Sequence, residues 1–340
     1  MRAEPLEQRC EWTSESLGDR YVFELTDDHV AELDAALTHA ESVTDDVLDI
    51  EKHHFPLPTL GPELDRIKED LINGAGVSLI RGVPVDRYGK ERASTIYWGI
   101  GTHLGMPWPQ NAKGHLLGDV TDQGKAVDDP TSRGNEIGGV PFPFHSDGSD
   151  LVGLFCLDAG KAGGESLVAN VVSIHNELTR TEPELAAALY EPMPYDFRGE
   201  QAPGGKGWYT MPIANRTEDR LFVRYIRPYI IASRRHADAP RPSEAANEAM
   251  DRVDAMCADP TFHVSMALRP GDMQFVNNYH VLHARKGYAD DREAGKIRHL
   301  KRLWLETDLL GDEQKPEAFR LGRTDSHWAS KGKTKSEIVV

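Results

Sequence analysis

Apolar side chains in the first seventy residues recur at the three- and four-residue spacing of amphipathic helices. They form two helical faces, the first with Val30, Leu33 and Leu37 and the second with Leu64, Ile67 and Leu71. The second pattern stops at Asn73-Gly74, a pair that is typical of a helix C-cap. We therefore predict that residues 1–74 form a helical N-terminal elaboration packed on a core domain.

Short apolar runs with turn residues between them dominate the rest of the chain, as expected for strands. These runs are 77–82, 151–157, 166–172, 221–226, 263–268, 273–277 and 299–305. Helical spacing appears around residues 93–104 and in two inserts, 173–190 and 243–257. Many short strands with few helices favour a double-stranded β-helix, or jelly roll, over a doubly wound parallel sheet. The expected fold is mainly β with helices (α+β), with a jelly-roll domain over 75–310 and a polar tail over 311–340 that lies on the surface or frays.

Residues 107–143 are rich in Gly, Asp, Asn and Pro and show no periodicity. A connection of this length without regular structure is more typical of a functional lid than of a simple linker. We therefore expect this segment to cover a site.

The charge of the chain narrows the range of partners. The 340 residues carry a formal net charge of -16, which repels phosphate backbones, so nucleic acid is not an expected partner. The apolar runs are far shorter than the ~20 residues that a membrane helix needs. The N-terminus lacks the apolar core of a secretory signal, and three scattered cysteines suit a reducing compartment, so we expect a cytoplasmic protein. The expected partner is a small-molecule substrate; a homo-oligomer is compatible with the sequence, which does not fix the oligomeric state.

The segment PFPFHSDGSD at 141–150 places His145 and Asp147 two residues apart just before a strand. In extended backbone both side chains point to the same side, where they offer a metal one nitrogen and one oxygen ligand. A third ligand must come from elsewhere, and RPGDMQFVNNYHVLHARKGY at 269–288 supplies two candidates, His280 and His283. Two histidines and one carboxylate form the facial triad of non-haem iron, which leaves three coordination positions open.

An arginine downstream adds an anion-binding group. In IRHLKRLWLE, strand alternation places Arg298, Leu300 and Arg302 on one face. A guanidinium that faces a core is costly unless it meets an anion, and the distal carboxylate of 2-oxoglutarate is a suitable one. Ser166, just after the Gly-Gly turn of AGGESLVAN, is placed to share that carboxylate.

The segments FHSDGSD, GGESLVAN, RPGDMQFVNNYHVLHAR and RHLKRLWLE, in this order, resemble the taurine dioxygenase and clavaminate synthase-like family of Fe(II)/2-oxoglutarate-dependent oxygenases. The resemblance covers residues 75–307. It implies an enzyme that binds Fe(II) through His145, Asp147 and His283. It also implies that 2-oxoglutarate and O2 are cosubstrates, with 2-oxoglutarate held by Arg298 and Ser166.

The resemblance also implies the reaction. A C-H bond of a small molecule, an amino acid or other small acid, is hydroxylated, or desaturated or cyclised, with succinate and CO2 as coproducts. Arg302 takes the place of the arginine that meets the acidic group of the substrate. The chain departs from the family at Asn277-Asn278-Tyr279, where the family usually has Asp-Asn-Arg, and in a longer spacing between His283 and Arg298.

Several residues have alternative interpretations. His280 is the competitor of His283 as the distal ligand, and Arg302 is equally compatible with a structural ion pair. Gln110 and Asn111, at the start of the long loop, are candidates for substrate binding or for a turn. The alternatives for the whole protein are a cupin-type metal enzyme that does not use 2-oxoglutarate, a zinc hydrolase, and a non-catalytic jelly-roll binding protein.

Overall fold

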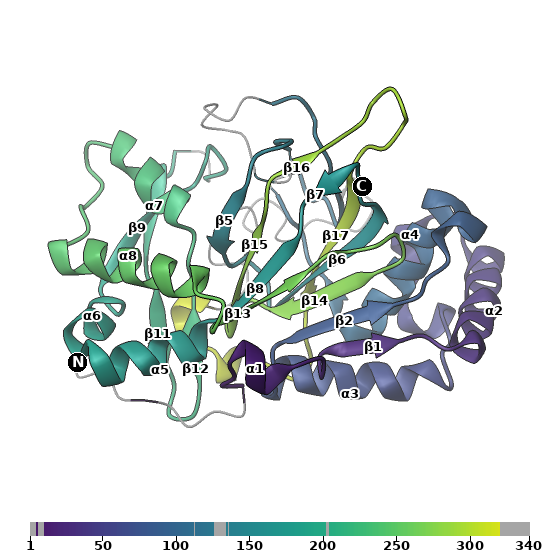
Figure 1. Cartoon of the computed structure of the whole chain (residues 1–340), viewed down its shortest axis with the longest axis horizontal. Helices are drawn as coiled ribbons and strands as arrows, with labels where there is room; N and C mark the ends of the chain where they lie inside the picture. The colour runs from purple at the N-terminus through teal and green to yellow at the C-terminus, as the bar shows by residue number, and fades with distance from the viewer. Residues whose placement is uncertain are drawn as a thin grey trace.

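A computed structural model of the chain describes Pro5 and residues 10–111, 113–125, 134, 136–201 and 204–319. Two β-sheets face each other, and helices cover their outer sides (Figure 1). No helix among the described residues is long and apolar enough to span a membrane. The predicted fold, mainly β with helices and built on a jelly roll, is confirmed, although the sheets that the described residues form do not close into a barrel.

The major sheet has seven strands, and all neighbouring strands except the first pair run antiparallel. In spatial order they are β1 (Val22–Glu24), β2 (Val77–Arg81), β14 (Met273–Asn277), β6 (Leu151–Asp158), β17 (His299–Glu306) and β3 (Met106–Pro107), with β4 (Leu117–Val120) also paired to β17. β1 adds a parallel strand from the N-terminal region to the edge of this sheet. The N-terminal region therefore contributes to the sheet as well as to the helical layer.

The minor sheet carries two of the predicted metal ligands. Its strands are, in order, β13 (His263–Met266), β8 (Ser166–Asn170), β15 (Val281–Arg285) and β5 (Phe142–His145). Three strand pairs lie outside the two sheets: β9 (Pro192–Asp196) with β10 (Trp208–Pro212), β11 (Ala214–Arg216) with β12 (Leu221–Val223), and β7 (Ala162–Gly163) with β16 (Tyr288–Ala289). The β9–β10 hairpin leads into one wall of the site.

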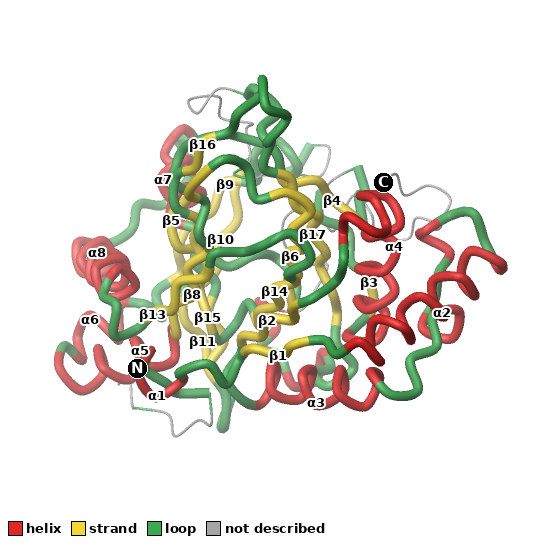
Figure 2. Tube along the Cα trace, turned by 45° about the vertical axis from the view of Figure 1, so that its right-hand side comes forward, coloured by secondary structure: helices red, strands yellow, loops and turns green. Residues whose placement is uncertain are grey.

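Helices cover both outer sides of the strands, as the turned view shows (Figure 2). α2 (Asp27–Val43), α3 (Leu60–Asn73) and α4 (Val85–Leu104) lie on the major-sheet side, and α5 (Val171–Thr181), α6 (Pro183–Ala188), α7 (Arg227–Ala232) and α8 (Glu244–Ala258) lie on the other. The described residues also form short helices: α1 (Ser14–Leu17), η1 (Val47–Asp49), η2 (Lys52–His54), η3 (Ser233–Arg235), η4 (Asp312–Gln314) and η5 (Glu317–Phe319). Pro183 begins α6, so the predicted helical insert 173–190 is two helices.

Strand β6 is buried on both of its faces, which explains its almost continuously apolar sequence. Val152 and Cys156 face the space between the two sheets, whereas Leu151 and Phe155 belong to the core beneath the helices. The ring of Phe155 stacks on Tyr97 of α4, with 5.1 Å between centroids. A strand that is buried on both faces loses the apolar–polar alternation of a half-exposed strand.

Two sequence predictions need correction. Part of the segment 107–143, expected to lack regular structure, forms β4 on the edge of β17; the segment also includes residues 112, 126–133 and 135, which lie outside the described residues. The tail was expected to lie on the surface or fray, yet Lys315 and Phe319 are buried. Residues 320–340 of that tail lie outside the described residues.

Candidate active site

Strand pairing brings the two histidines of the predicted triad together. His145 is the last residue of β5 and lies directly opposite His283 in β15. Side chains at opposed positions of an antiparallel pair are neighbours, and the two imidazole centroids are 4.1 Å apart. Register between these strands therefore sets the spacing of two nitrogen ligands.

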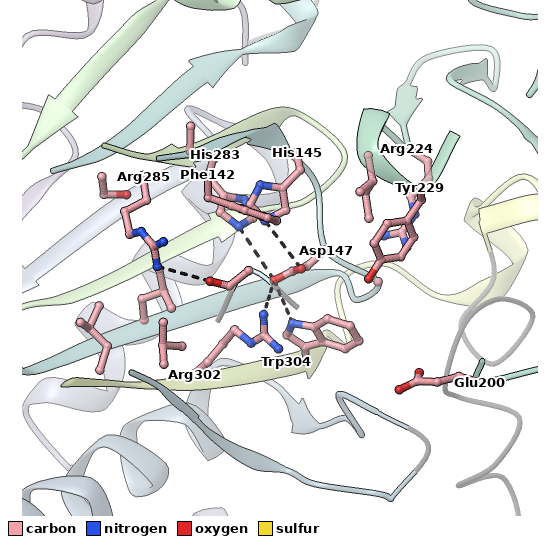
Figure 3. Close-up of a pocket in the computed structure, with 18 of the residues that line it drawn as sticks. Phe142, His145, Asp147, Glu200, Arg224, Tyr229, His283, Arg285, Arg302 and Trp304 are labelled. Carbon is pink, nitrogen blue, oxygen red and sulfur yellow. Dashed lines mark hydrogen bonds and ion pairs between the residues drawn. The ribbon is translucent and has the colours of Figure 1, made fainter. Parts of the chain in front are cut away.

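Asp147 completes the cluster from the loop that follows β5 (Figure 3). Its Oδ1 lies 4.0 Å from His145 Nε2, and its Oδ2 lies 3.9 Å from His283 Nε2. One ligand atom from each of the three residues lies within 4.8 Å of the others, and all three residues are buried. His145 Nδ1 donates to the carbonyl of Pro143 at 2.9 Å, which leaves its Nε2 lone pair facing the cluster. This donor set fits the facial triad of a non-haem iron.

The surroundings favour the protonation states that a metal requires. Burial lowers the pKa of His283 to about 3, and burial also lowers the pKa of His145. Burial alone would raise the pKa of Asp147, but Arg302, the two imidazoles and the hydrogen bond from Trp304 together outweigh it, and the pKa of that carboxyl is lowered. At neutral pH both imidazoles are thus neutral and the carboxylate is ionised, so no proton has to be displaced when a cation binds.

Asp147 is supported by two groups that the sequence reasoning missed. Trp304 Nε1 donates to Asp147 Oδ2 at 3.0 Å, and the backbone N–H of Asp147 donates to Asn278 Oδ1 at 3.0 Å. The Asn278 amide also donates to the carbonyl of Ser149 at 2.9 Å, which holds the loop that carries Asp147. A signal for Trp304 was available, because it follows Arg302 by two residues and so shares its face of β17.

Arg298 lies in the same cavity as the cluster. Its side chain is 4% exposed, and Nη1 has no hydrogen-bond partner among the described residues. Burial and the nearby charge of Arg285 lower the pKa of Arg298 to about 10, so it remains charged at neutral pH. A buried guanidinium nitrogen without a partner is costly, which indicates that the site is built to receive an anion.

The Gly-Gly turn before Ser166 makes room for Arg298. Gly164 has a φ of +76°, and a Cβ at this position would lie 2.8 Å from Arg298 Nε. A side chain there would be strained and would displace the guanidinium. Ser166 is buried and lines the cavity together with Arg298.

Arg302 also lines the cavity, on the opposite side of Asp147 from Tyr229 (Figure 3). Its Nη1 lies 3.6 Å from Asp147 Oδ2, and its Nε donates to Gln110 Oε1 at 2.8 Å. Gln110 is buried, and its amide donates to the carbonyl of Arg302. Gln110 is therefore placed to orient Arg302.

The structure does not bring every candidate to the cavity. Neither Gln110 nor Asn111 is among the described residues that line it. Asn111 Oδ1 accepts from the backbone N–H of Lys113 at 3.0 Å, the contact expected of a turn residue. His280 is buried outside the triad, with its Nδ1 3.2 Å from the Asn277 amide.

The remaining cavity wall comes from segments in which the sequence showed no ligand spacing. Phe197 and Glu200 follow β9, Arg224 lies before α7, and Tyr229 lies in α7. The cavity measures about 1030 Å³ including its open mouth. It has room for an ion together with small organic ligands.

Comparison with known proteins places this geometry in a family. The profile described as "Taurine catabolism dioxygenase TauD, TfdA family" matches residues 35–304. FR-33289 synthase of Streptomyces rubellomurinus is 32% identical over 266 residues, which cover 77% of this chain and 78% of that protein. Taurine hydroxylase-like protein SAT17 of Stachybotrys chartarum is 27% identical over 300 residues, 85% of this chain and 76% of that protein.

Solved structures agree on the fold. An asparagine oxygenase in complex with Fe(II), 2S,3S-3-hydroxyasparagine and succinate aligns with a TM-score of 0.66 at 20% identity, covering 84% of this chain and 93% of that one. The non-haem iron oxygenase OrfP in complex with Fe and alpha-ketoglutaric acid aligns with a TM-score of 0.65 at 17% identity, covering 90% and 98%. The resemblance expected from the sequence is thereby confirmed, and the chain belongs to the TauD/TfdA family of dioxygenases.

Proposed function

We propose that this protein is an Fe(II)/2-oxoglutarate-dependent dioxygenase that hydroxylates a C-H bond of an amino acid or other small acid. One observation carries the proposal: the cluster of His145, Asp147 and His283 shares its cavity with the buried guanidinium of Arg298. A metal enzyme that does not use an oxoacid has no need for such a group. Membership of a dioxygenase family supports the same reaction class.

The roles follow from position. His145, Asp147 and His283 would hold the iron, and Arg298 with Ser166 would bind the distal carboxylate of 2-oxoglutarate. When bound, iron and 2-oxoglutarate would activate O2, of which one oxygen atom enters the C-H bond of the substrate and the other enters succinate as 2-oxoglutarate loses CO2. The protein would position the two ligands relative to the substrate between the sheets.

The substrate class rests on Arg302 and on the structural relatives. Arg302, fixed by Gln110 beside Asp147, is placed to meet an acidic group of a substrate near the iron. The names of two relatives refer to asparagine and to hydroxylated arginine, which supports a small amino acid or related acid here. Three free, buried cysteines fit a reducing compartment, and we propose a cytoplasmic location.

Anaerobic titration with Fe(II) and 2-oxoglutarate tests this function. We expect a weak visible charge-transfer band from the chelate, and iron-dependent succinate formation once oxygen is admitted. Arg298→Gln should weaken 2-oxoglutarate binding roughly 10- to 100-fold, because it removes a charge-assisted hydrogen bond. Fe(II) affinity in the absence of 2-oxoglutarate should stay unchanged in this variant.

Arg292→Gln is the matched control, because Arg292 is an exposed arginine that pairs with Asp122 on the surface. It should bind 2-oxoglutarate like the wild type. If the wild type gives neither the band nor succinate, the proposed function is wrong.

A further inference from the structure

The end of the cavity assigned to 2-oxoglutarate contains a second arginine, Arg285. It lies in β15 two residues after the metal ligand His283, so strand alternation places both side chains on the same face. Arg285 lines the cavity together with Arg298 and Ser166. Figure 3 shows its side chain in the cavity, beside that of His283. The roles assigned so far leave this cation unexplained.

Strand register places Arg285 next to the hydroxyl expected to bind the cosubstrate. Arg285 lies directly opposite Ser166 in the antiparallel pair of β15 and β8. Side chains at opposed positions of such a pair are neighbours on one face of the sheet. Arg298 comes from the other sheet, as the residue just before β17. One hydroxyl and two guanidinium groups thus reach the same end of the cavity from two sheets.

The two guanidinium groups share one aromatic ring. The guanidinium carbons of Arg285 and Arg298 lie 5.0 and 5.2 Å from the ring centroid of Tyr288. The charge of Arg285 adds to the effect of burial in lowering the pKa of Arg298. Attraction to the ring offsets only part of the repulsion between two buried cations. An anion between them would remove the rest.

Neither arginine has an anionic partner in the part of the chain that the structure describes. Arg285 donates to neutral groups, the carbonyls of Gly134, Ile137 and Val140. Arg285 Nε and Arg298 Nη1 are buried and have no hydrogen-bond partner among the described residues. Each side chain therefore keeps a charge and a donor for a ligand.

We propose that Arg285 binds the distal carboxylate of 2-oxoglutarate together with Arg298 and Ser166, so that two guanidinium groups recognise the cosubstrate. The inference rests on the proposed function and deepens its cosubstrate site. The carboxylate would compensate the repulsion between the two cations and accept hydrogen bonds from their unused donors. Selection of the cosubstrate would then depend on Arg285 as well as on Arg298.

A pair of oxoacids separates contact with the distal carboxylate from a general structural role. 2-Oxopentanoate has the chain length and the chelating groups of 2-oxoglutarate, with a methyl group in place of the distal carboxylate. Both dissociation constants are measured anaerobically from the visible band of the ferrous protein, and their ratio is compared among variants. We expect the wild type to prefer 2-oxoglutarate about 1000-fold or more, because the methyl group leaves two buried cations without an anion.

Arg285→Gln should lower this preference about 10- to 100-fold by weakening the binding of 2-oxoglutarate alone. If Arg285 served only to hold the loop of residues 136–141, its loss would weaken both oxoacids alike and the ratio would not change. Lys286→Gln is the matched control, because it removes the same charge from the next residue, which is exposed. Its ratio should equal that of the wild type.

Arg298→Gln provides an independent measurement if Arg285→Gln does not fold. Its preference for 2-oxoglutarate should fall but stay above about tenfold, because Arg285 and Ser166 still contact the carboxylate.

Three results would overturn the proposal: an unchanged ratio in Arg285→Gln, an equal fall in Lys286→Gln, or loss of the whole preference in Arg298→Gln. In each case the wild type still shows the band with 2-oxoglutarate, so the proposed function stands. Absence of that band in the wild type would instead remove the proposed function itself.

Discussion

Asp147 is the triad residue that depends most on its neighbours, since a buried carboxylate is stable only when it is paired and hydrogen-bonded. Trp304 Nε1 donates to it at 3.0 Å, and the guanidinium of Arg302 lies 3.6 Å away. Groups that orient a metal ligand affect metal affinity although they never touch the ion. Trp304 is therefore expected to act through Asp147.

Trp304→Phe keeps the aromatic bulk and removes the N–H that orients Asp147. We expect Fe(II) affinity to fall about tenfold or more, measured anaerobically by equilibrium titration. Trp98→Phe is the control, because the Trp98 indole donates to the carbonyl of Ile50 in the core beneath the helices. Equal iron affinities of the two variants would show that the indole of Trp304 only fills space.

At the scale of residues, the sequence indicated those site residues whose role follows from the spacing or motif of a short segment. His145 and Asp147 were visible because two residues in extended backbone share a side, and His283 was preferred to His280 through the resemblance. Arg224 carried no such signal, because it lies in the short connection between β12 and α7, where no repeating pattern marks the residues that reach the cavity. Arg302 drew attention, but its link to Gln110 spans 192 positions and depends on tertiary structure.

At the scale of elements, the segment after β17 is attached to the loop that carries Asp147. Lys315 Nζ lies 2.7 Å from Asp150 Oδ1, and both side chains are fully buried. Asp150 also accepts from Tyr279 Oη at 2.7 Å and from the backbone N–H of Thr307 at 3.1 Å. The sequence did not predict this attachment, because the segment after residue 310 is polar and a single buried lysine produces no apolar pattern.

Lys315→Met removes the cation and leaves Asp150 buried without its charge partner. Breaking one side of a buried ion pair typically costs about 3–5 kcal/mol, and we expect a loss of that order in the free energy of unfolding from urea titrations. The double variant Asp150→Asn/Lys315→Met should recover part of the loss, because no buried charge then remains unpaired.

Lys68→Met is the comparison for this segment. Lys68, whose own side chain is 10% exposed, pairs at 3.0 Å with Asp308, whose side chain is 76% exposed. The carboxylate that this variant leaves without its partner is therefore in contact with solvent. Lys68→Met should cost less than about 1 kcal/mol. A Lys315→Met protein as stable as Lys68→Met would show that the buried pair contributes little.

At the scale of the whole molecule, several histidines are buried because helices cover the outer sides of the strands. Burial lowers the pKa of His175 to about 4 and that of His280 to about 3, and it also lowers the pKa of His103. His175 accepts or donates a 2.8 Å hydrogen bond with Tyr190, far along the chain from the triad. In the unfolded chain each of these side chains has a pKa near 6.5.

The sign of the resulting pH dependence follows from proton counts. Between about pH 4 and 6.5 the unfolded state binds protons that the folded state does not, so stability falls as pH falls through this window. Above about pH 7 both states are neutral at these histidines and the effect vanishes. A lowered carboxyl pKa such as that of Asp147 acts only below this window, because its unfolded value is near 3.9.

The metal-free protein should therefore lose stability between pH 7.5 and pH 5, and His175→Gln should lose about 2 kcal/mol less than the wild type over this interval. The comparison uses the change with pH within each protein, so the cost of losing the contact with Tyr190 drops out. Denaturant titrations at the two pH values provide the measurement. Parallel pH dependences of the two proteins would mean that His175 is protonated in the folded state at pH 5, which requires water to reach a side chain that is 1% exposed.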